Sequence, residues 1–128
     1  MCIIRLSEVY LNAAEAGVHL GGPEAESGRQ YLNTLIGQRT PTASMQVSAE
    51  DFTIDRVLDE RRRELVGEGQ IFFDFLRNQR AITRTGSWHL GTLKTSNAQT
   101  IQPTDLRIAL PIPQSEIDAN PNMVQNVR

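Results

Sequence analysis

The stretch from Asp59 to Arg77, DERRRELVGEGQIFFDFLR, constrains the fold more than any other part of the sequence. It reads as a charged helix that stops at a Gly-Glu-Gly sequence and continues as an apolar helix. At about 100° per residue, the first helix has an apolar face with Arg61 in its middle, formed by Ile54, Val57, Leu58 and Leu65. A guanidinium there must extend its head to water or bind a carboxylate. The sequence therefore predicts that Arg61 is a buried tie whose anion is Glu68 or Asp74.

The first part of the chain is predicted to form helices joined by short connections. Residues 3–18 are apolar around almost the whole helix, so this helix is expected to be covered on more than one side; the exception is a narrow polar strip of Arg5, Glu8, Asn12 and Glu15. Gly21-Gly22-Pro23 ends it and starts a second helix, which makes an αα-hairpin of tetratricopeptide-like length. A third helix is predicted to end near Val66, and a fourth to span residues 70–80.

After residue 80 the helical periodicity disappears. Residues 81–105 are rich in Thr, Ser, Asn, Gly and Gln and are predicted to form a long irregular connection. Residues 106–110 are predicted to be extended, because Pro111 and Pro113 exclude a helix there. We therefore predict an all-α chain of tetratricopeptide-like helical hairpins followed by an irregular segment with little strand. It is expected to be one domain, 1–128, with a helical scaffold over 1–80 and a Pro-rich closing segment in 81–128.

Charge and composition exclude several classes of protein. The formal net charge is −2, which argues against nucleic acid as a partner, since nucleic-acid binding needs a positive surface. There is no apolar run of about 20 residues that spans a membrane. The single cysteine, Cys2, excludes an internal disulfide and a cysteine-based metal site. Neither a cofactor nor a metal ion is expected.

An enzymatic role would have to use the carboxylates of Glu60, Glu64, Glu68 and Asp74, because paired carboxylates are what glycoside hydrolysis requires. These carboxylates alternate with arginines, so their charges are expected to be compensated and none is an obvious proton donor. The sequence contains no Ser-His-Asp elbow, phosphate loop or HExxH. We therefore predict no catalytic residue and no enzyme.

Three ordered segments resemble the SusD/RagB family. They are the helix–glycine–helix segment ERRRELVGEGQIFFDFLR, the closing segment LPIPQSEIDANPNMVQN of residues 110–126, and RLSEVYLNAAEA of residues 5–16. Members of this family are much longer, and the resemblance covers only their C-terminal part. It therefore implies that this chain is a fragment of a longer protein, with some apolar surface lacking its natural cover.

The resemblance also implies a function. SusD-like proteins are lipid-anchored, surface-exposed components of the Gram-negative outer membrane that bind oligosaccharides without cleaving them. They work with a SusC-like TonB-dependent transporter. The resemblance implies that the membrane is reached only through a lipid anchor on an N-terminal part outside these residues. The alternative is a helical-repeat scaffold that mediates protein contacts without binding sugar.

Trp88 and His89 are the candidate ligand-binding residues. Sugar capture uses aromatic platforms and hydrogen-bonding side chains, and both residues lie in the polar segment where exposure is expected. The alternative for Trp88 is a hydrophobic plug under the loop, since tryptophan is highly buried on average. The sequence leaves both interpretations open.

Overall fold

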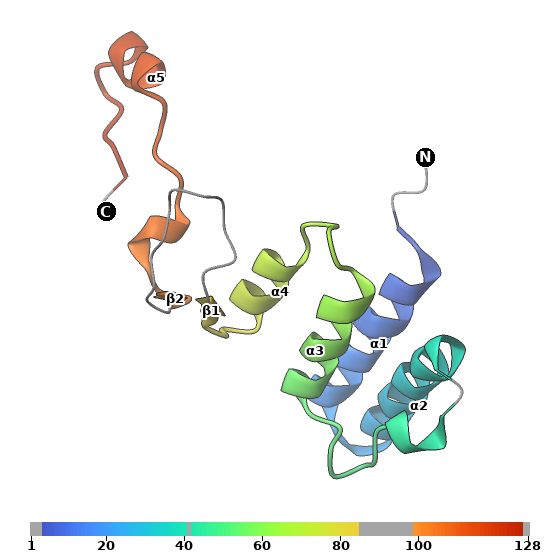
Figure 1. The fold of residues 1–128 in the computed structure, drawn as a ribbon. Coiled ribbons are helices and arrows are strands. Elements are labelled where there is room, and N and C mark those ends of the chain that lie inside the picture. Colours follow the sequence, from blue (N-terminus) through green and yellow to red (C-terminus); the bar gives the residue numbers. More distant parts are fainter. Residues whose placement is uncertain (1–3, 41, 85–98, 127–128) are drawn as a thin grey trace. The chain divides into compact units, whose positions relative to one another are not determined.

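The computed structural model describes residues 4–40, 42–84 and 99–126. Its elements are α1 (Leu6–Leu20), α2 (Gly22–Arg39), the 3-10 helix η1 (Ala43–Met45), α3 (Ile54–Glu64), α4 (Ile71–Arg77), β1 (Ile82–Arg84), β2 (Gln99–Ile101), the 3-10 helix η2 (Leu106–Ile108) and α5 (Gln114–Ala119) (Figure 1). Helices dominate the described residues, and the strands are short, which confirms the all-α prediction. The chain divides into two compact units, Met1–Asp74 and Phe75–Arg128.

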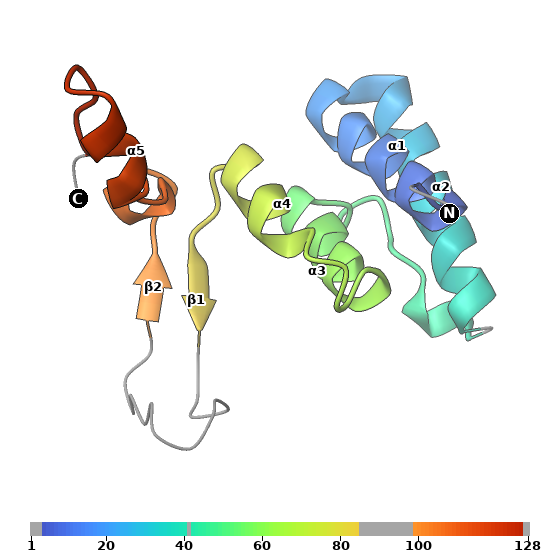
Figure 2. The same ribbon diagram turned by 90° about the horizontal axis from the view of Figure 1, so that it is seen from above.

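Helices α1 and α2 form the predicted hairpin and lie side by side (Figure 2). The reversal between them uses Gly21 and Gly22, whose φ angles of 73° and 56° lie in the region that favours glycine. The Gly21 N–H donates to the carbonyl of Gly17 at 3.0 Å and so closes the last turn of α1. The Gly-Gly-Pro sequence therefore provides both the end of one helix and the start of the next.

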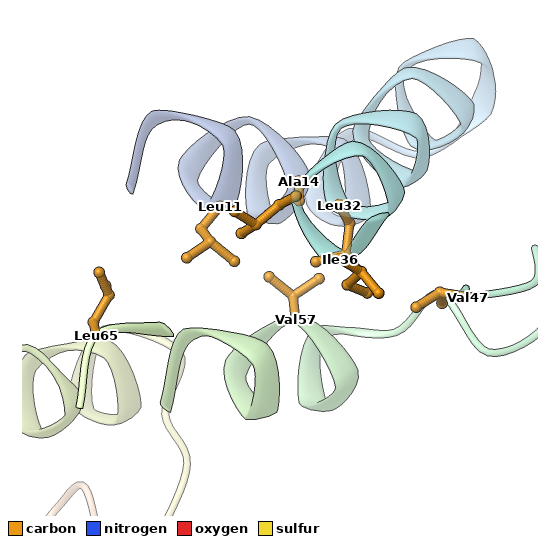
Figure 3. Packing of buried hydrophobic residues seen from close by; sticks show 8 residues of the cluster. Leu11, Ala14, Leu32, Ile36, Val47, Val57 and Leu65 are labelled. Carbon is orange, nitrogen blue, oxygen red and sulfur yellow. The ribbon is translucent and has the colours of Figure 1, made fainter. Parts of the chain in front are cut away.

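The core of the first unit lies where α3 meets this hairpin (Figure 3). Leu11 of α1, Leu32 of α2 and Val57 of α3 are each 0% exposed, which places all three helices around one apolar centre. The other buried members of the cluster are Ala14, Leu35, Ile36, Val47 and Leu65. Such burial is the main stabilising contribution to a domain of this size.

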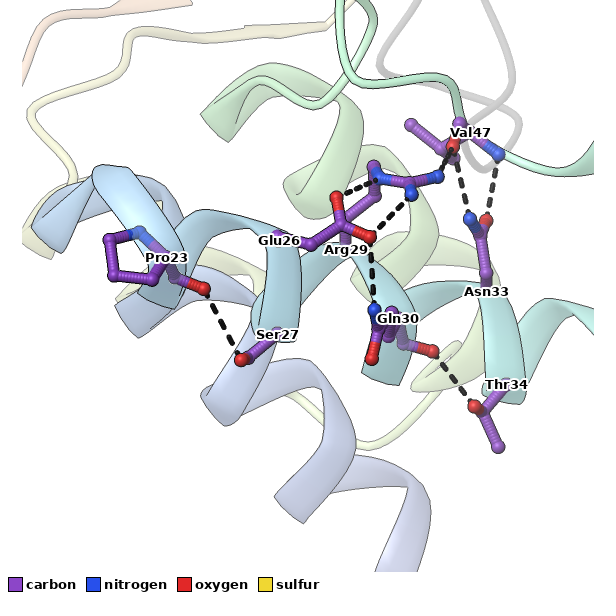
Figure 4. A network of polar contacts seen from close by, with 8 residues as sticks. All are labelled: Pro23, Glu26, Ser27, Arg29, Gln30, Asn33, Thr34 and Val47. Carbon is purple, nitrogen blue, oxygen red and sulfur yellow. Dashed lines mark hydrogen bonds and ion pairs between the residues drawn. The ribbon is translucent and has the colours of Figure 1, made fainter.

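A polar clamp fixes the connection between α2 and α3 (Figure 4). The side-chain amide of Asn33 bonds both backbone groups of Val47: its nitrogen donates to the carbonyl at 3.0 Å, and its oxygen accepts from the N–H at 2.7 Å. Arg29 donates to the same carbonyl at 3.0 Å. Because these groups are satisfied by α2, the connection can bury the Val47 side chain in the core.

The C-terminal ends of α3 and α4 differ from the predicted ones, and α3 ends at Glu64, two residues before the predicted Val66. Thr53 caps α3, with its hydroxyl accepting the N–H of Arg56 at 3.3 Å. Helix α4 ends at Arg77, three residues earlier than predicted. The chain turns there because Gln79 has a φ of 53° and the N–H of Arg80 bonds the carbonyl of Phe75 at 2.8 Å.

The second unit combines a small sheet with a closing segment. Strands β1 and β2 pair antiparallel with Ile82 opposite Ile101. The prediction that residues 106–110 are extended is wrong for residues 106–108, which form the 3-10 helix η2. The side chain of Gln125 bonds the N–H of Ile112 at 2.9 Å and its carbonyl at 3.0 Å, and this closes the segment around α5.

Candidate functional site

The buried guanidinium of Arg61, on α3, joins residues from α1 and α4 that belong to the first unit. Its Nε donates to Oδ2 of Asp74 in α4 at 2.9 Å, and its Nη1 donates to Oδ1 of Asn12 in α1 at 2.7 Å. A second carboxylate, that of Glu15, lies 3.9 Å from Nη1. Arg61 is 3% exposed and Asp74 1% exposed, so the pair is removed from water. A charge pair in this environment is stable only because hydrogen bonds satisfy its remaining groups.

Of the two carboxylates considered for Arg61, the structure places Asp74 against it. Glu68 lies elsewhere, with Oε1 at 2.7 Å from Nη2 of Arg5. The contact between Asn12 and Arg61 is not predicted from the sequence, although Asn12 belongs to the polar strip on the first helix. That strip is the signal, because it also contains Glu15, which is 8% exposed, and a buried polar group needs a polar partner.

A second ionic cluster surrounds Glu64, whose side chain is 7% exposed. Its Oε1 accepts from Nη1 of Arg5 at 2.8 Å and from Nη2 of Arg39 at 2.6 Å, and its Oε2 accepts from Nε of Arg39 at 2.8 Å. The hydrogen bonds from Arg39 lower the pKa of Glu64, against the opposing effect of burial. Glu64 therefore stays ionised and connects α3 to the start of α1 and to the end of α2.

We predict that Glu64 contributes an acid-sensitive part of the stability. Its pKa in the folded chain lies below its ordinary value of 4.5, so its contribution is present above about pH 4.5 and disappears as the pH falls through the folded pKa. Glu64→Gln should lower the free energy of unfolding by about 1–2 kcal/mol at pH 7, because both arginine partners are partly exposed. Chemical denaturation at pH 7 and pH 3 measures this; the difference from the wild type should shrink at pH 3.

The control for this prediction is Glu50→Gln, which removes an exposed carboxylate from the same unit. It should change the free energy of unfolding by no more than about 0.5 kcal/mol at either pH. An unchanged stability of Glu64→Gln at pH 7, or a loss that is equally large at pH 3, would contradict the role assigned to Glu64.

The carboxylates that a hydrolase would need are all paired with arginine. Glu60 Oε2 lies 2.8 Å from Nη1 of Arg56 and 3.1 Å from Nη1 of Arg63, and the partners of Glu64, Glu68 and Asp74 are given above. Carboxylates held by guanidinium groups in this way keep their charge compensated and do not form an acid–base pair across an open cleft. The arrangement is that of a structural ionic network.

A surface groove of about 470 Å³ lies over this network, between the end of α2 and one face of α3. Ile36 and Met45 supply its apolar part, and the rest is polar; the polar lining residues are Arg39, Thr40, Arg56, Glu60, Arg63 and Glu64. Within the groove Arg39 pairs with Glu64, and Arg56 and Arg63 pair with Glu60. The residues that line it include no aromatic side chain.

The candidate ligand-binding residues Trp88 and His89 lie outside the residues that the structure describes. Within the described ranges, no His, Cys, Asp and Glu side chains gather in a group of three or more that fits a metal ion. Among the helices of the described part, none combines the length and apolar character that crossing a membrane requires.

Comparison with known proteins identifies the family. The sequence profile of the SusD family matches residues 1–128. The chain belongs to the SusD family. A SusD superfamily protein from Bacteroides thetaiotaomicron VPI-5482 is similar to it over 99% of the chain, with 68% sequence identity and a TM-score of 0.87. One from Bacteroides vulgatus ATCC 8482 is similar over 97% of the chain, with 45% identity and a TM-score of 0.83.

These relatives are considerably longer than the SusD-family chain described here. Residues 1–128 span 28% of the Bacteroides thetaiotaomicron chain and 27% of the Bacteroides vulgatus chain. No curated protein matches the sequence. The family assignment therefore rests on the profile match and on the similarity to the two solved structures.

Proposed function

We propose that this SusD-family chain is part of a glycan-binding component of an outer-membrane, TonB-dependent nutrient-uptake system. The observation that carries the proposal is the family match over residues 1–128. The partners would be an oligosaccharide and a SusC-like transporter, and no nucleic acid. Residues 1–128 would form the C-terminal part of a surface-exposed protein whose lipid anchor lies on its N-terminal part.

The proposed role is binding without catalysis. It is supported by the ionic network, because Glu60 and Glu64 are each held by two arginines and Asp74 by Arg61. A general acid needs a proton at the operating pH, whereas the pKa of Glu64 is lowered. These residues therefore serve the scaffold, and the sugar contacts come from elsewhere.

Trp88 and His89 are the residues that we propose for contact with sugar. An indole ring offers a large apolar face on which a pyranose ring stacks, and an imidazole offers hydrogen bonds to hydroxyl groups. Adjacent in sequence within a polar segment, the two residues can serve the same sugar unit.

The test uses a chimera in which residues 1–128 replace the matching part of the Bacteroides thetaiotaomicron relative. Calorimetry with a panel of oligosaccharides should detect binding of at least one glycan. Trp88→Ala should weaken that binding by roughly tenfold, which corresponds to a contact of about 1.4 kcal/mol. Phe73→Ala, at an aromatic side chain that is 64% exposed outside this segment, is the matched control and should leave the affinity unchanged.

The outcomes separate the two parts of the proposal. A folded chimera that binds no glycan in the panel overturns the glycan-binding role and favours the helical-repeat scaffold. Glycan binding that survives both Trp88→Ala and His89→Ala keeps the role and overturns the assignment of these residues. Release of reducing sugar that disappears with Glu64→Gln would reinstate an enzyme.

A further inference from the structure

The groove of about 470 Å³ between the end of α2 and α3 has its positive charges at the surface and its negative charges beneath them. We call it the arginine groove. The side chains of Glu60 and Glu64 are only 11% and 7% exposed, whereas those of Arg39 and Arg63 are 53% and 61% exposed. Arg56, at 23%, lies between these extremes. A ligand that enters the groove therefore meets guanidinium groups before it meets a carboxylate.

These guanidinium groups keep hydrogen-bond donors that the protein does not use. Arg39 donates through Nε and Nη2 to Glu64, while Arg56 and Arg63 each donate only through Nη1 to Glu60. Within the part of the chain that the structure describes, Nη1 of Arg39 and both Nε and Nη2 of Arg56 and Arg63 make no hydrogen bond. A guanidinium group with two such donors on one side binds a planar oxyanion bidentately.

The lining of the arginine groove also has a surplus of positive charge. Three arginines and two glutamates line it, so one positive charge remains, although the chain as a whole carries −2. A single added carboxylate would neutralise this surplus. Hydrogen bonds between charged partners are roughly twice as strong as neutral ones, so such a ligand does not need the aromatic platform that the groove lacks. The charge therefore favours a ligand with one anionic group.

The hollow that adjoins the arginine groove restricts the ligand further. It has a volume of about 570 Å³ and shares Met45, Arg56 and Arg63 with the groove. Its other charged lining residues are exposed carboxylates, Glu50, Asp51, Asp55 and Asp59. A second anionic group would be repelled there, whereas sugar hydroxyl groups can donate hydrogen bonds to carboxylates. The ligand therefore combines one anionic unit with neutral, hydroxyl-bearing units.

We propose that the arginine groove binds the carboxylate of a uronic acid unit, with neutral sugar units of the same oligosaccharide extending into the adjoining hollow. Both volumes lie within the usual range of ligand sites. Met45, which is 51% exposed, offers apolar contact to the C–H groups of a sugar ring. The inference rests on the proposed glycan-binding function, and it adds a ligand class and a contact region separate from Trp88 and His89.

The test compares cellobiouronic acid with cellobiose, which differ only in a carboxylate that replaces one hydroxymethyl group. Residues 1–128 suffice, because the arginine groove and the adjoining hollow belong to the first unit. In a nitrogen-15 NMR titration, the acid should bind roughly tenfold more tightly than cellobiose and should shift the Nε–H signals of Arg56 and Arg63. Its affinity should fall when NaCl is raised from about 0.05 M to about 0.5 M, because salt screens exposed charges.

Arg63→Gln should weaken the binding of cellobiouronic acid by roughly fivefold or more, since it removes a guanidinium group from the groove. Its Tm should change by less than about 2 °C, because the side chain is mostly exposed. The matched control is Arg62→Gln, at the neighbouring residue of the same helix. Arg62 is 53% exposed, pairs with Asp59 at 3.5 Å and does not line the groove. This control should leave the affinity unchanged.

Several outcomes would overturn the proposal. Equal affinity for the acid and for cellobiose would do so, and so would an equal loss of binding in Arg62→Gln and Arg63→Gln. Inorganic sulfate that binds as tightly as cellobiouronic acid would show an adventitious ion only, with no contribution from the sugar. Tighter binding of digalacturonate, which carries two carboxylates, would contradict the repulsion assigned to the acidic hollow.

The chimera separates this inference from the proposed function. If the chimera binds neutral glycans and residues 1–128 show no preference for the acid, the glycan-binding role stands and the uronate site is overturned. If the chimera binds no glycan, including cellobiouronic acid, both proposals are overturned.

Discussion

Replacing Asp74 with alanine is expected to lower the free energy of unfolding by about 3–5 kcal/mol, the usual cost of removing one partner from a buried ion pair. Arg61 would keep its charge at 3% exposure and lose the carboxylate that lies 2.9 Å from its Nε. Asn12 and Glu15 would remain near Nη1, at 2.7 and 3.9 Å in the native arrangement, while Nε would lose the carboxylate it binds. The loss therefore comes mainly from a buried charge that has lost its directly hydrogen-bonded carboxylate.

Urea denaturation at pH 7 measures this change through the midpoint at constant slope. The matched control is Asp59→Ala, which breaks a pair on the same helix: Asp59 lies 3.5 Å from Arg62 and both side chains are about half exposed. That pair should contribute no more than about 0.5 kcal/mol. Asp74→Asn, which keeps an oxygen acceptor but removes the charge, should fall between the two alanine variants. Equal costs for Asp74→Ala and Asp59→Ala would show that Arg61 does not depend on its carboxylate.

The sequence predicts that Arg61 is buried because a charged residue in the middle of an apolar helical face has few alternatives. It does not decide between Glu68 and Asp74, because the answer depends on the direction in which the chain returns after the glycines. In the structure Gly67 and Gly69 have φ angles of 81° and 74°. Glycine adopts such angles readily. The Gly-Glu-Gly sequence therefore permits several turn directions and does not determine which carboxylate reaches Arg61.

Contacts between residues that are distant in the sequence are the hardest to predict from it. Arg39 and Glu64 are separated by 25 residues, and their pairing depends on how the connection between α2 and α3 is fixed. That connection is held by Asn33, whose amide clamps the backbone of Val47, a contact with no sequence motif. In the same way, Gln79 ends α4 through its own backbone angle, although the helical pattern continues to Arg80.

The sequence predicts that α1 is covered on more than one side, whereas the described structure covers only the side of Leu11 and Ala14. A hydrophobic pattern indicates which faces of a helix are apolar, but it does not say which segment covers each face. Among the described residues, the opposite face of α1 is exposed at Leu6, Val9 and Leu20. Trp88 and His89, the predicted sugar contacts, stay a prediction because they lie outside the described residues.

Replacing glycine with alanine is expected to change the stability in opposite directions at two positions, one at the crossing of α1 and α2 and one away from it. A methyl group added at Gly17 would lie 2.7 Å from the carbonyl oxygen of Glu24 and 2.9 Å from the Cα of Gly28. Both atoms belong to the backbone of α2, so the clash is relieved only if the helices move apart. Gly37 is also in a helix, but a methyl group there meets nothing within 4 Å.

Gly17→Ala should therefore destabilise the chain by about 1–3 kcal/mol, because the cost of overpacking exceeds the gain in helix propensity. Gly37→Ala should stabilise it by about 0.5–1 kcal/mol, since only the gain applies. The same chemical change thus separates the two variants by several kcal/mol in urea denaturation. Both substitutions restrict the unfolded chain equally, so the difference in stability between the two variants reports the contact at the helix crossing. If Gly17→Ala were as stable as Gly37→Ala, the two backbones would not be in contact, and Leu11 and Leu32 would not close the core as described.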